Sequence, residues 1–194
     1  WNPLRAGPHR WYCEKISPGC DNCYASTFNR RLGGAVYPLA MADDARDPAE
    51  RPHLDEKALT TPRGWKKPRR IFVCSMTDLF GEWVTDEQLH RVFDAMENEY
   101  RHTFQILTKR PKRMYEYLSR RWQAAYLPQF IWVGVTVESD RYTWRADYLR
   151  KTPAAVRWIS AEPLISPLPS LDLSGIDWIV TGGESGHGAR PFNP

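Results

Sequence analysis

The sequence predicts an α/β fold, a partial open (β/α)6 barrel of the TIM type with parallel strands, in a single domain over residues 1–194. Short apolar, β-branched segments recur along the chain, and amphipathic segments of helix length separate most of them. Parallel strands need a crossover of this length. No glycine-rich phosphate turn follows the first strand, so a barrel suits the pattern better than a nucleotide-binding doubly wound sheet.

Six strands and four main helices are expected. The strands lie around residue 11 and over 69–76, 102–110, 130–139, 156–163 and 177–185. The helices lie over 22–32, 85–100, 111–122 and around 141–151. The helix at Thr85 has two signals, because Thr85 and Gln88 form a capping-box pattern and apolar residues follow at helical spacing.

Two segments depart from the alternation. Residues 33–68, rich in Pro, Arg and Asp, are too long for a simple connection, so we expect an irregular excursion with one short helix near 48–56. Residues 163–175 are expected to be extended and to cross the sheet edge. The chain starts at Trp1 without a methionine and stops at Pro194 where a helix should begin, so flanking residues are expected to be missing.

Composition excludes several classes of protein. Four cysteines are too few for a disulfide scaffold, which favours a reducing, cytoplasmic location. No membrane-spanning run and no signal-peptide pattern occurs, so no membrane partner is expected. The net charge of +4 is mildly basic, but cations gather near aromatic residues at 63–70, 109–113 and 120–121. Such segments suit nucleic acid, although solvated arginines and core tryptophans explain them slightly better.

Three cysteines lie close together in the stretch CEKISPGCDNCY (13–24), with the spacing C-x6-C-x2-C. Cys20 and Cys23 can face one metal from the turn that enters a helix, and the turn 17–19 brings Cys13 round. Thiolates suit zinc, copper(I) or iron–sulfur clusters. Three thiolates leave one iron of a four-iron cluster open, which makes Cys13, Cys20 and Cys23 candidate metal ligands.

A structural zinc site would need a fourth ligand, which the sequence does not supply plainly. Cys74 lies inside a predicted strand with apolar neighbours and is interpreted as a small buried hydrophobe. His9 is a lone histidine in a loop and is interpreted as a surface residue.

Polar residues stand at the carboxyl ends of the predicted strands, where the loops of a (β/α) barrel converge. These candidate site residues are Ser75, Thr77, Asp78, Thr108, Lys109, Thr136, Glu138, Glu162, Gly182, Gly183 and Glu184. Polar caps on ordinary turns explain each strand end singly but explain the whole set poorly. Glu162 and Glu184 could serve acid/base roles, but no catalytic residue is assigned.

The cysteine loop and the barrel pattern together resemble a phage- and bacterium-encoded three-cysteine-motif family of unknown function. That family looks like a divergent branch of the radical S-adenosylmethionine (SAM) enzymes, nearest the spore photoproduct lyase-like group. The matching stretches, which span essentially the whole chain, are WNP at 1–3, SPGCDNCY at 17–24, RRIFVCSMTDLF at 69–80, HTFQILTKRP at 102–111, WVGVTVES at 132–139, ISAEPL at 159–164 and IVTGGESGHGARP at 179–191.

The resemblance implies a radical-SAM-like core with a [4Fe–4S] cluster on the three cysteines and SAM on the open iron. Reduction of the cluster, by a partner such as flavodoxin or ferredoxin, would cleave SAM to a radical that abstracts hydrogen from the substrate. Tyr24 is similar to the aromatic residue of the lyase-like group at this place. Residues 77–78 and 108–109 match strand ends that line the SAM pocket, with Lys109 the expected partner of the SAM carboxylate and Glu138 of the ribose hydroxyls.

Two features depart from the commonest radical-SAM pattern. That pattern is C-x3-C-x2-C with an aromatic residue before the last cysteine, whereas here the first gap is x6 and Asn22 precedes Cys23. The Gly-Gly-Glu that holds the SAM amino group usually follows the second strand, whereas Gly182-Gly183-Glu184 follows the sixth. This triplet is therefore either a relocated SAM motif or part of the substrate site.

Three interpretations remain open at this point. The first is an iron–sulfur enzyme of radical SAM type that acts on an unknown substrate, with a nucleobase or nucleic acid among the candidates. The second is a zinc-clipped nucleic-acid-binding module without catalysis. The third is a phage-type accessory protein whose cysteines have lost their metal, and a separate partner protein is compatible with all three.

Overall fold

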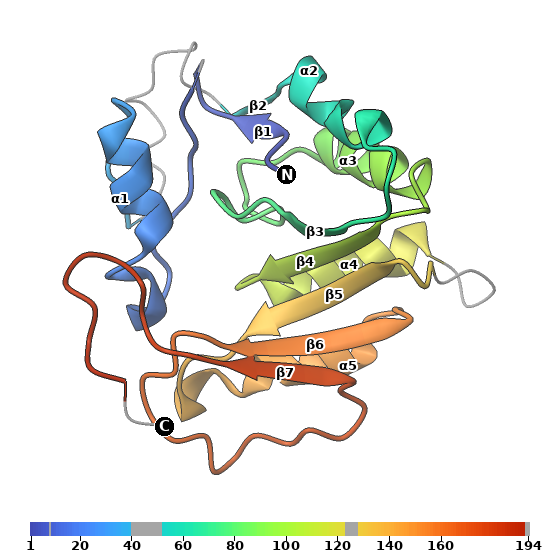
Figure 1. Cartoon of the computed structure of the whole chain (residues 1–194). Helices are drawn as coiled ribbons and strands as arrows, with labels where there is room; N and C mark the ends of the chain where they lie inside the picture. The colour runs from blue at the N-terminus through green and yellow to red at the C-terminus, as the bar shows by residue number, and fades with distance from the viewer. Residues whose placement is uncertain (8, 40–51, 123–127, 193–194) are drawn as a thin grey trace.

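The computed structural model describes residues 1–7, 9–39, 52–122 and 128–192, and its main feature is one parallel sheet. The sheet has five strands in chain order: β3 (Arg70–Val73), β4 (Thr103–Thr108), β5 (Ile131–Thr136), β6 (Val156–Ala161) and β7 (Trp178–Thr181). Helices α3 (Asp86–Glu97), α4 (Pro111–Arg121) and α5 (Trp144–Lys151) follow the first three strands and cover one face of the sheet (Figure 1). The predicted α/β fold with parallel strands is confirmed, and the sheet is consistent with a partial open barrel.

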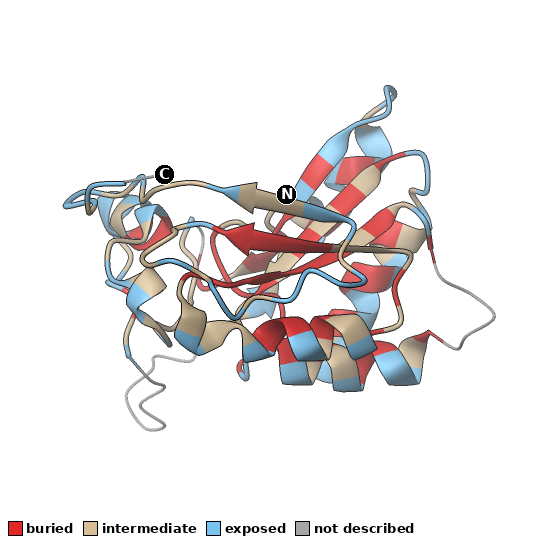
Figure 2. Ribbon diagram, turned by 90° about the horizontal axis from the view of Figure 1, so that it is seen from below, coloured by how far each residue is buried: buried red, intermediate tan, exposed pale blue. Residues whose placement is uncertain are grey.

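The helices form where capping and apolar spacing predict them. Thr85 accepts a hydrogen bond from the Gln88 amide, and the Gln88 side chain accepts one from the Thr85 amide, so the capping box of α3 is complete. Pro111 occupies the start of α4, where its missing amide hydrogen costs nothing. On each helix the buried residues form a stripe that faces the sheet (Figure 2).

The two faces of the sheet carry different side chains, because side chains alternate along a strand. The helix-facing positions are apolar and at most 4 % exposed: Ile71, Val73, Phe104, Ile106, Ile131, Val133, Val135 and Ile159. Together with the inner faces of α3, α4 and α5 they form the main core. The opposite face is free of helices and borders the site described below (Figure 1).

The sixth strand predicted near Trp11 does not form, so the sheet has five strands in place of six. The Trp11 amide donates to the Asn29 side chain (2.8 Å) and its ring packs against Arg5 and Phe28, which leaves this backbone without a strand partner. Trp1 lies beside β3 in its stead, since its carbonyl accepts from the Cys74 amide (2.8 Å).

The segment at 33–68 contains small elements that the sequence did not separate. A two-residue strand β2 (His53–Leu54) pairs antiparallel with β1 (Leu4–Arg5), and α2 (Glu56–Leu59) and the 3-10 helix η3 (Thr61–Gly64) follow it. The short helix predicted near 48–56 falls largely outside the described residues, and residues 52–55 are not helical.

The connection between β6 and β7 is extended, as predicted, because no helix occurs between residues 162 and 177. In the described ranges no helix has the length and apolar character that a membrane crossing requires.

Candidate functional site

A cavity of about 600 Å³ lies between the helix-free face of the sheet and the cysteine loop. Most of the predicted site residues border it: Cys13, Cys20, Cys23, Tyr24, Ser75, Thr77, Asp78, Thr108, Lys109, Thr136, Glu162, Gly183 and Glu184. They come from the loop at 13–24 and from the carboxyl ends of β3, β4, β5, β6 and β7. The parallel register of the sheet therefore brings the predicted strand ends to one place, as a barrel mouth requires.

The cysteine loop reaches the cavity through two short turns. The 3-10 helix η1 (Pro18–Cys20) ends at Cys20, and Cys23 is the residue that precedes α1 (Tyr24–Arg31). All three loop cysteines are free thiols of intermediate exposure. Over the described ranges, no three His, Cys, Asp or Glu side chains are close enough together to hold a metal ion. The donor set thus fits a soft metal by its chemistry and its place on the cavity, but binding has to draw the thiols together.

Two ionisable groups beside the loop are held in their neutral forms. Burial, and then the nearby carboxylate of Asp78, raises the pKa of Cys13 to about 12. Burial and the neighbouring Cys23 raise the pKa of Tyr24, whose hydroxyl donates to the Ser75 carbonyl (3.1 Å). A metal would lower the pKa of a coordinating thiol, so the environment of Cys13 favours its protonated form until a metal binds.

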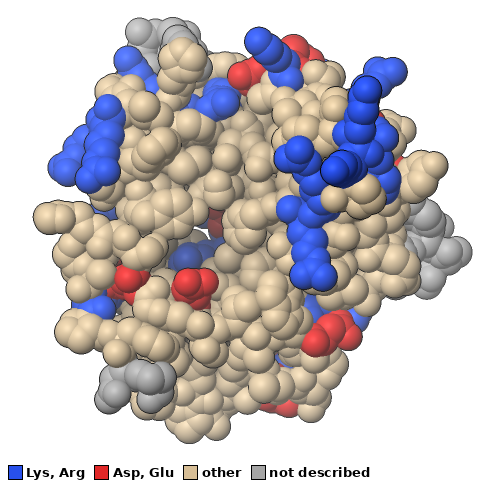
Figure 3. All heavy atoms as spheres, viewed as in Figure 1, with Lys and Arg blue, Asp and Glu red and all other residues tan. Residues whose placement is uncertain are grey.

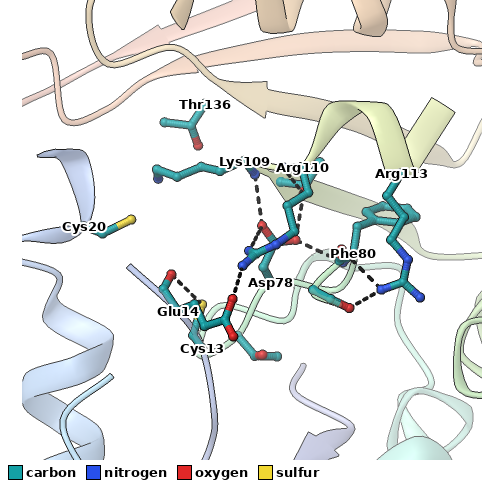
Figure 4. Close-up of polar contacts among 12 residues, drawn as sticks. Cys13, Glu14, Cys20, Asp78, Phe80, Lys109, Arg110, Arg113 and Thr136 are labelled. Carbon is teal, nitrogen blue, oxygen red and sulfur yellow. Dashed lines mark hydrogen bonds and ion pairs between the residues drawn. The ribbon is translucent and has the colours of Figure 1, made fainter. Parts of the chain in front are cut away.

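Asp78 links the end of β3 to the end of β4 (Figure 4). Its carboxylate accepts four hydrogen bonds: from the Thr108 hydroxyl (2.6 Å), the amides of Phe80 and Lys109 (both 3.0 Å) and the Arg110 guanidinium (3.3 Å). All of its acceptor positions are in use, and Asp78 is only 7 % exposed. Asp78 therefore positions the strand ends and is not free to bind a ligand directly.

Arg110 is the main site residue that sequence reasoning did not single out. Its guanidinium bridges Asp78 and Glu14, at 3.3 and 2.9 Å (Figure 4). It also lies over the Trp83 ring. Burial opposes its charge, but the carboxylates of Asp78 and Glu14 outweigh burial, so the pKa of Arg110 is raised. Arg110 thereby ties β4 to Glu14, the residue next to Cys13. Its position directly after Lys109 at a strand end was the available signal.

Lys109 is the free cation of the cavity. Its ammonium makes no hydrogen bond or ion pair with any of the described residues. Figure 4 shows its side chain running from the end of β4 toward the side of the cavity where Thr136 and Cys20 lie. An unpaired ammonium in a part-enclosed cavity is suited to bind an anionic group of a ligand.

Glu184 fastens the segment after β7 onto the cysteine loop. Its carboxylate accepts from the Asn22 side chain (2.8 Å) and the Arg190 amide (2.7 Å), and it forms an ion pair with the Arg190 guanidinium. The hydrogen bond from Arg190 is the main reason that the pKa of Glu184 falls to about 2. Arg190 also donates to the Pro18 carbonyl (2.7 Å). The Glu184 carboxylate is therefore occupied in holding the cysteine loop. This contact explains its position without either of the two roles left open for the triplet, a SAM motif or a part of the substrate site.

Gly186 lies in the same contact between the cysteine loop and the segment after β7. A methyl group at this position would meet the Asn22 carbonyl oxygen at 1.8 Å, so only glycine allows the segment at 182–192 to lie this close to the loop. Sequence reasoning treated Asn22 only as a departure from an aromatic residue. The structure shows that it joins the cysteine loop to the segment after β7.

Two predicted residues do not line the cavity. Glu138 is fully buried and forms an ion pair with Arg145 (2.8 Å), so the structure does not present it to a ribose hydroxyl as expected. Arg145 also donates to the Thr136 carbonyl (2.9 Å), which makes the pair a support behind the loop after β5. Gly182 is absent from the lining, and a methyl group there would meet Glu162 at 2.9 Å.

The two candidates for a fourth zinc ligand differ in position. Cys74 borders the cavity but is 4 % exposed and packs in the main core, and burial raises the pKa of its thiol to about 12. Its backbone has φ of 59°, in the left-handed region that a cysteine rarely adopts. His9 is exposed and does not border the cavity. Their interpretations as a buried hydrophobe and a surface residue agree with these positions.

A family model described as "Protein of unknown function (DUF5131)" matches residues 1–194, the whole chain. Comparison with curated proteins and with solved structures gives no match.

Proposed function

Since the chain belongs to the DUF5131 family, whose function is unknown, the site itself has to indicate the chemistry, and we propose that the protein is an iron–sulfur enzyme of radical SAM type. One observation carries the proposal. Three free thiols from one short loop border the same cavity as the polar ends of five parallel strands. Three thiolates, with no fourth metal ligand grouped with them among the described residues, suit a cluster with one open iron better than a closed structural zinc site.

Cys13, Cys20 and Cys23 would hold the cluster, which supplies the electron for reductive cleavage of bound SAM. Lys109 provides the unpaired cation for the SAM carboxylate, at the end of β4. Tyr24 borders the cavity beside Cys23. Glu162, at the end of β6, makes no hydrogen bond with the described residues, so it is free to accept one from a ligand.

The residues around the loop have a supporting role in this proposal. Arg110 and Glu14 hold one side of the loop, and Glu184 holds the other through Asn22. Both contacts are made to residues adjacent to a cysteine. They therefore limit how far the loop can move when it closes on a metal, which keeps the binding cost of ordering the loop small.

Metal and sulfide analysis of protein purified without oxygen tests the cluster. We expect about four iron and four sulfide per chain, and loss of both in Cys13→Ala, Cys20→Ala and Cys23→Ala. Cys74→Ala is the matched control, because it removes a thiol of the same cavity that lies outside the loop, and it should keep the iron. A colourless protein that binds one zinc per chain contradicts the proposal and supports the zinc-clipped module.

A second measurement tests the chemistry. With a strong reductant, or with flavodoxin or ferredoxin as the electron donor, the reconstituted protein should form 5′-deoxyadenosine from SAM. Lys109→Ala should weaken SAM binding and leave the iron content unchanged, because Lys109 is not a thiol ligand. A protein with a full cluster that never cleaves SAM would restrict the proposal to iron–sulfur binding.

A further inference from the structure

We propose that the helix-free face of the sheet binds a base of a single-stranded nucleic acid, whose phosphates lie along the exposed cations of residues 63–70. This names the substrate class of the proposed enzyme and rests on that function for the reaction. The binding itself depends on neither the cluster nor SAM, so it can be measured separately.

The helix-free face includes three rows of side chains between the cysteine loop and Arg70, and the strand register sets them. The row nearest the cysteine loop is polar at Thr136 and Ser160, which are paired across β5 and β6. Two rows lie further from the loop and are aromatic-rich. One contains Leu107, Gly134, Trp158 and Trp178, and the other contains Phe72, Gln105 and Trp132. The cavity therefore extends beyond the strand ends over the rings of Phe72, Trp158 and Trp178, which we call the aromatic floor. A cluster and SAM bound at the strand ends would not need these rings.

The Trp158 ring lies close against the sheet because a glycine lies under it. A methyl group at Gly134 would meet the Trp158 ring at 2.5 Å, so the missing side chain lets the indole lie against β5. Trp178 stacks on Trp158 with ring centroids 5.1 Å apart and an interplanar angle of 26°, and Phe72 meets Trp158 edge-on. Trp178 and Phe72 remain 38 % and 37 % exposed. Two accessible rings held by a buried third form a stacking surface for a planar group.

Hydrogen-bonding groups without partners border this floor. The Gln105 side chain makes no hydrogen bond with the described residues, although an amide can both donate and accept. The Trp158 indole nitrogen is buried and has no acceptor among them. A buried donor without a partner is costly, and a ligand that supplies an acceptor relieves that cost. A nucleobase offers a planar ring and edge groups of both kinds, which matches this combination.

Cations lie next to the aromatic floor, at the start of β3 and on the segment that precedes it. Arg70 alternates with the buried Ile71 on β3 and shares the helix-free side with Phe72. Lys66, Lys67 and Arg70 are exposed and form no ion pair with the described residues. Figure 3 shows a hollow in this face and a row of Lys and Arg side chains along one side of it, over the segment that leads from α2 to β3. Unpaired cations beside a stacking surface are suited to a single strand.

Fluorescence anisotropy with a labelled single-stranded oligonucleotide, DNA and RNA in turn, tests binding to the metal-free full chain. We expect salt-dependent binding that Trp178→Ala weakens about 5- to 150-fold. The matched control is Trp144→Ala, because Trp144 is 45 % exposed but lies on α5 and not on the cavity. Gln105→Ala should weaken binding with little effect on the salt dependence. The double variant Lys66→Ala/Lys67→Ala should lower the salt slope by about one to two.

Each alternative result overturns the proposal. Loss of binding in Trp144→Ala but not in Trp178→Ala would place the ligand elsewhere. Binding of free nucleotides without salt-dependent binding of oligonucleotides would point to a small-molecule substrate. Displacement of the oligonucleotide by SAM in a one-to-one manner would assign the floor to the cofactor. A protein that forms 5′-deoxyadenosine but binds no oligonucleotide would keep the proposed function and refute this substrate class alone.

Discussion

Replacement of Asp78 by asparagine tests whether this one carboxylate joins the ends of β3 and β4. Asparagine has nearly the same size but keeps only one acceptor oxygen. That oxygen can still accept from Phe80 and Thr108. The new amide group then faces the Lys109 amide and the Arg110 guanidinium, which are both donors.

The expected loss follows from the burial of this contact. The Asp78 and Arg110 side chains are only 8 % and 10 % exposed, so breaking their pair resembles the removal of one partner from a buried ion pair. Such a change costs about 3–5 kcal/mol. Glu14 remains within 2.9 Å of Arg110 and keeps part of its charge compensated. We therefore expect the free energy of unfolding to fall by about 2–4 kcal/mol.

Urea unfolding at neutral pH, followed by tryptophan fluorescence, measures this loss. Asp147→Asn is the matched control, because the Asp147 side chain pairs with Arg150 but is 56 % exposed, and its loss should stay within about 0.5 kcal/mol. The midpoint should shift without a change in the slope. A loss in Asp78→Asn no larger than in the control would refute the reasoning that this carboxylate holds the two strand ends together.

Two further predictions concern the contact between the cysteine loop and the segment after β7. Because the pKa of Glu184 is about 2 against an ordinary 4.5, its pair with Arg190 stabilises the fold above about pH 4.5 and is lost as the pH falls toward 2. The wild type should thus lose about 1 kcal/mol more than Glu184→Gln between about pH 5 and pH 3, since the 38 % exposure of Arg190 reduces the full effect of the pKa difference. Parallel urea titrations that coincide for the two proteins would contradict this. Gly186→Ala should open residues 182–192 to limited proteolysis through its clash with Asn22, whereas Gly64→Ala, which meets open space, should not.

The order of helices and strands could be read from the sequence, because each depends on local patterns. The capping box at Thr85, the proline at the start of α4 and the alternating apolar residues of β4 are each contained in fewer than about twenty residues. The prediction of a strand near Trp11 was wrong because it, too, rested on a local pattern alone. An apolar aromatic segment satisfies the local pattern of a strand, but the Trp11 amide donates its hydrogen bond to the Asn29 side chain on α1 and not to a neighbouring strand.

The candidate site was predictable to the level of strand ends and no further. A parallel sheet brings all carboxyl ends to one edge, so the positions of Asp78, Thr108 and Thr136 followed from the fold class alone. Which of these side chains is free and which is occupied did not follow. Glu138 and Lys109 both stand near strand ends. Glu138 is paired in the interior, whereas the Lys109 ammonium borders the cavity and has no partner among the described residues.

The sequence by itself determined the α/β architecture and the three thiols of the loop, because both depend on residue types and on spacings within short segments. Only the tertiary structure decided that Glu184 reaches back across 162 positions to Asn22 and that Trp158 lies flat over Gly134. Those contacts join residues far apart in the chain. They depend on strand register and on the close approach of two backbone segments, and neither can be predicted from a local stretch of sequence.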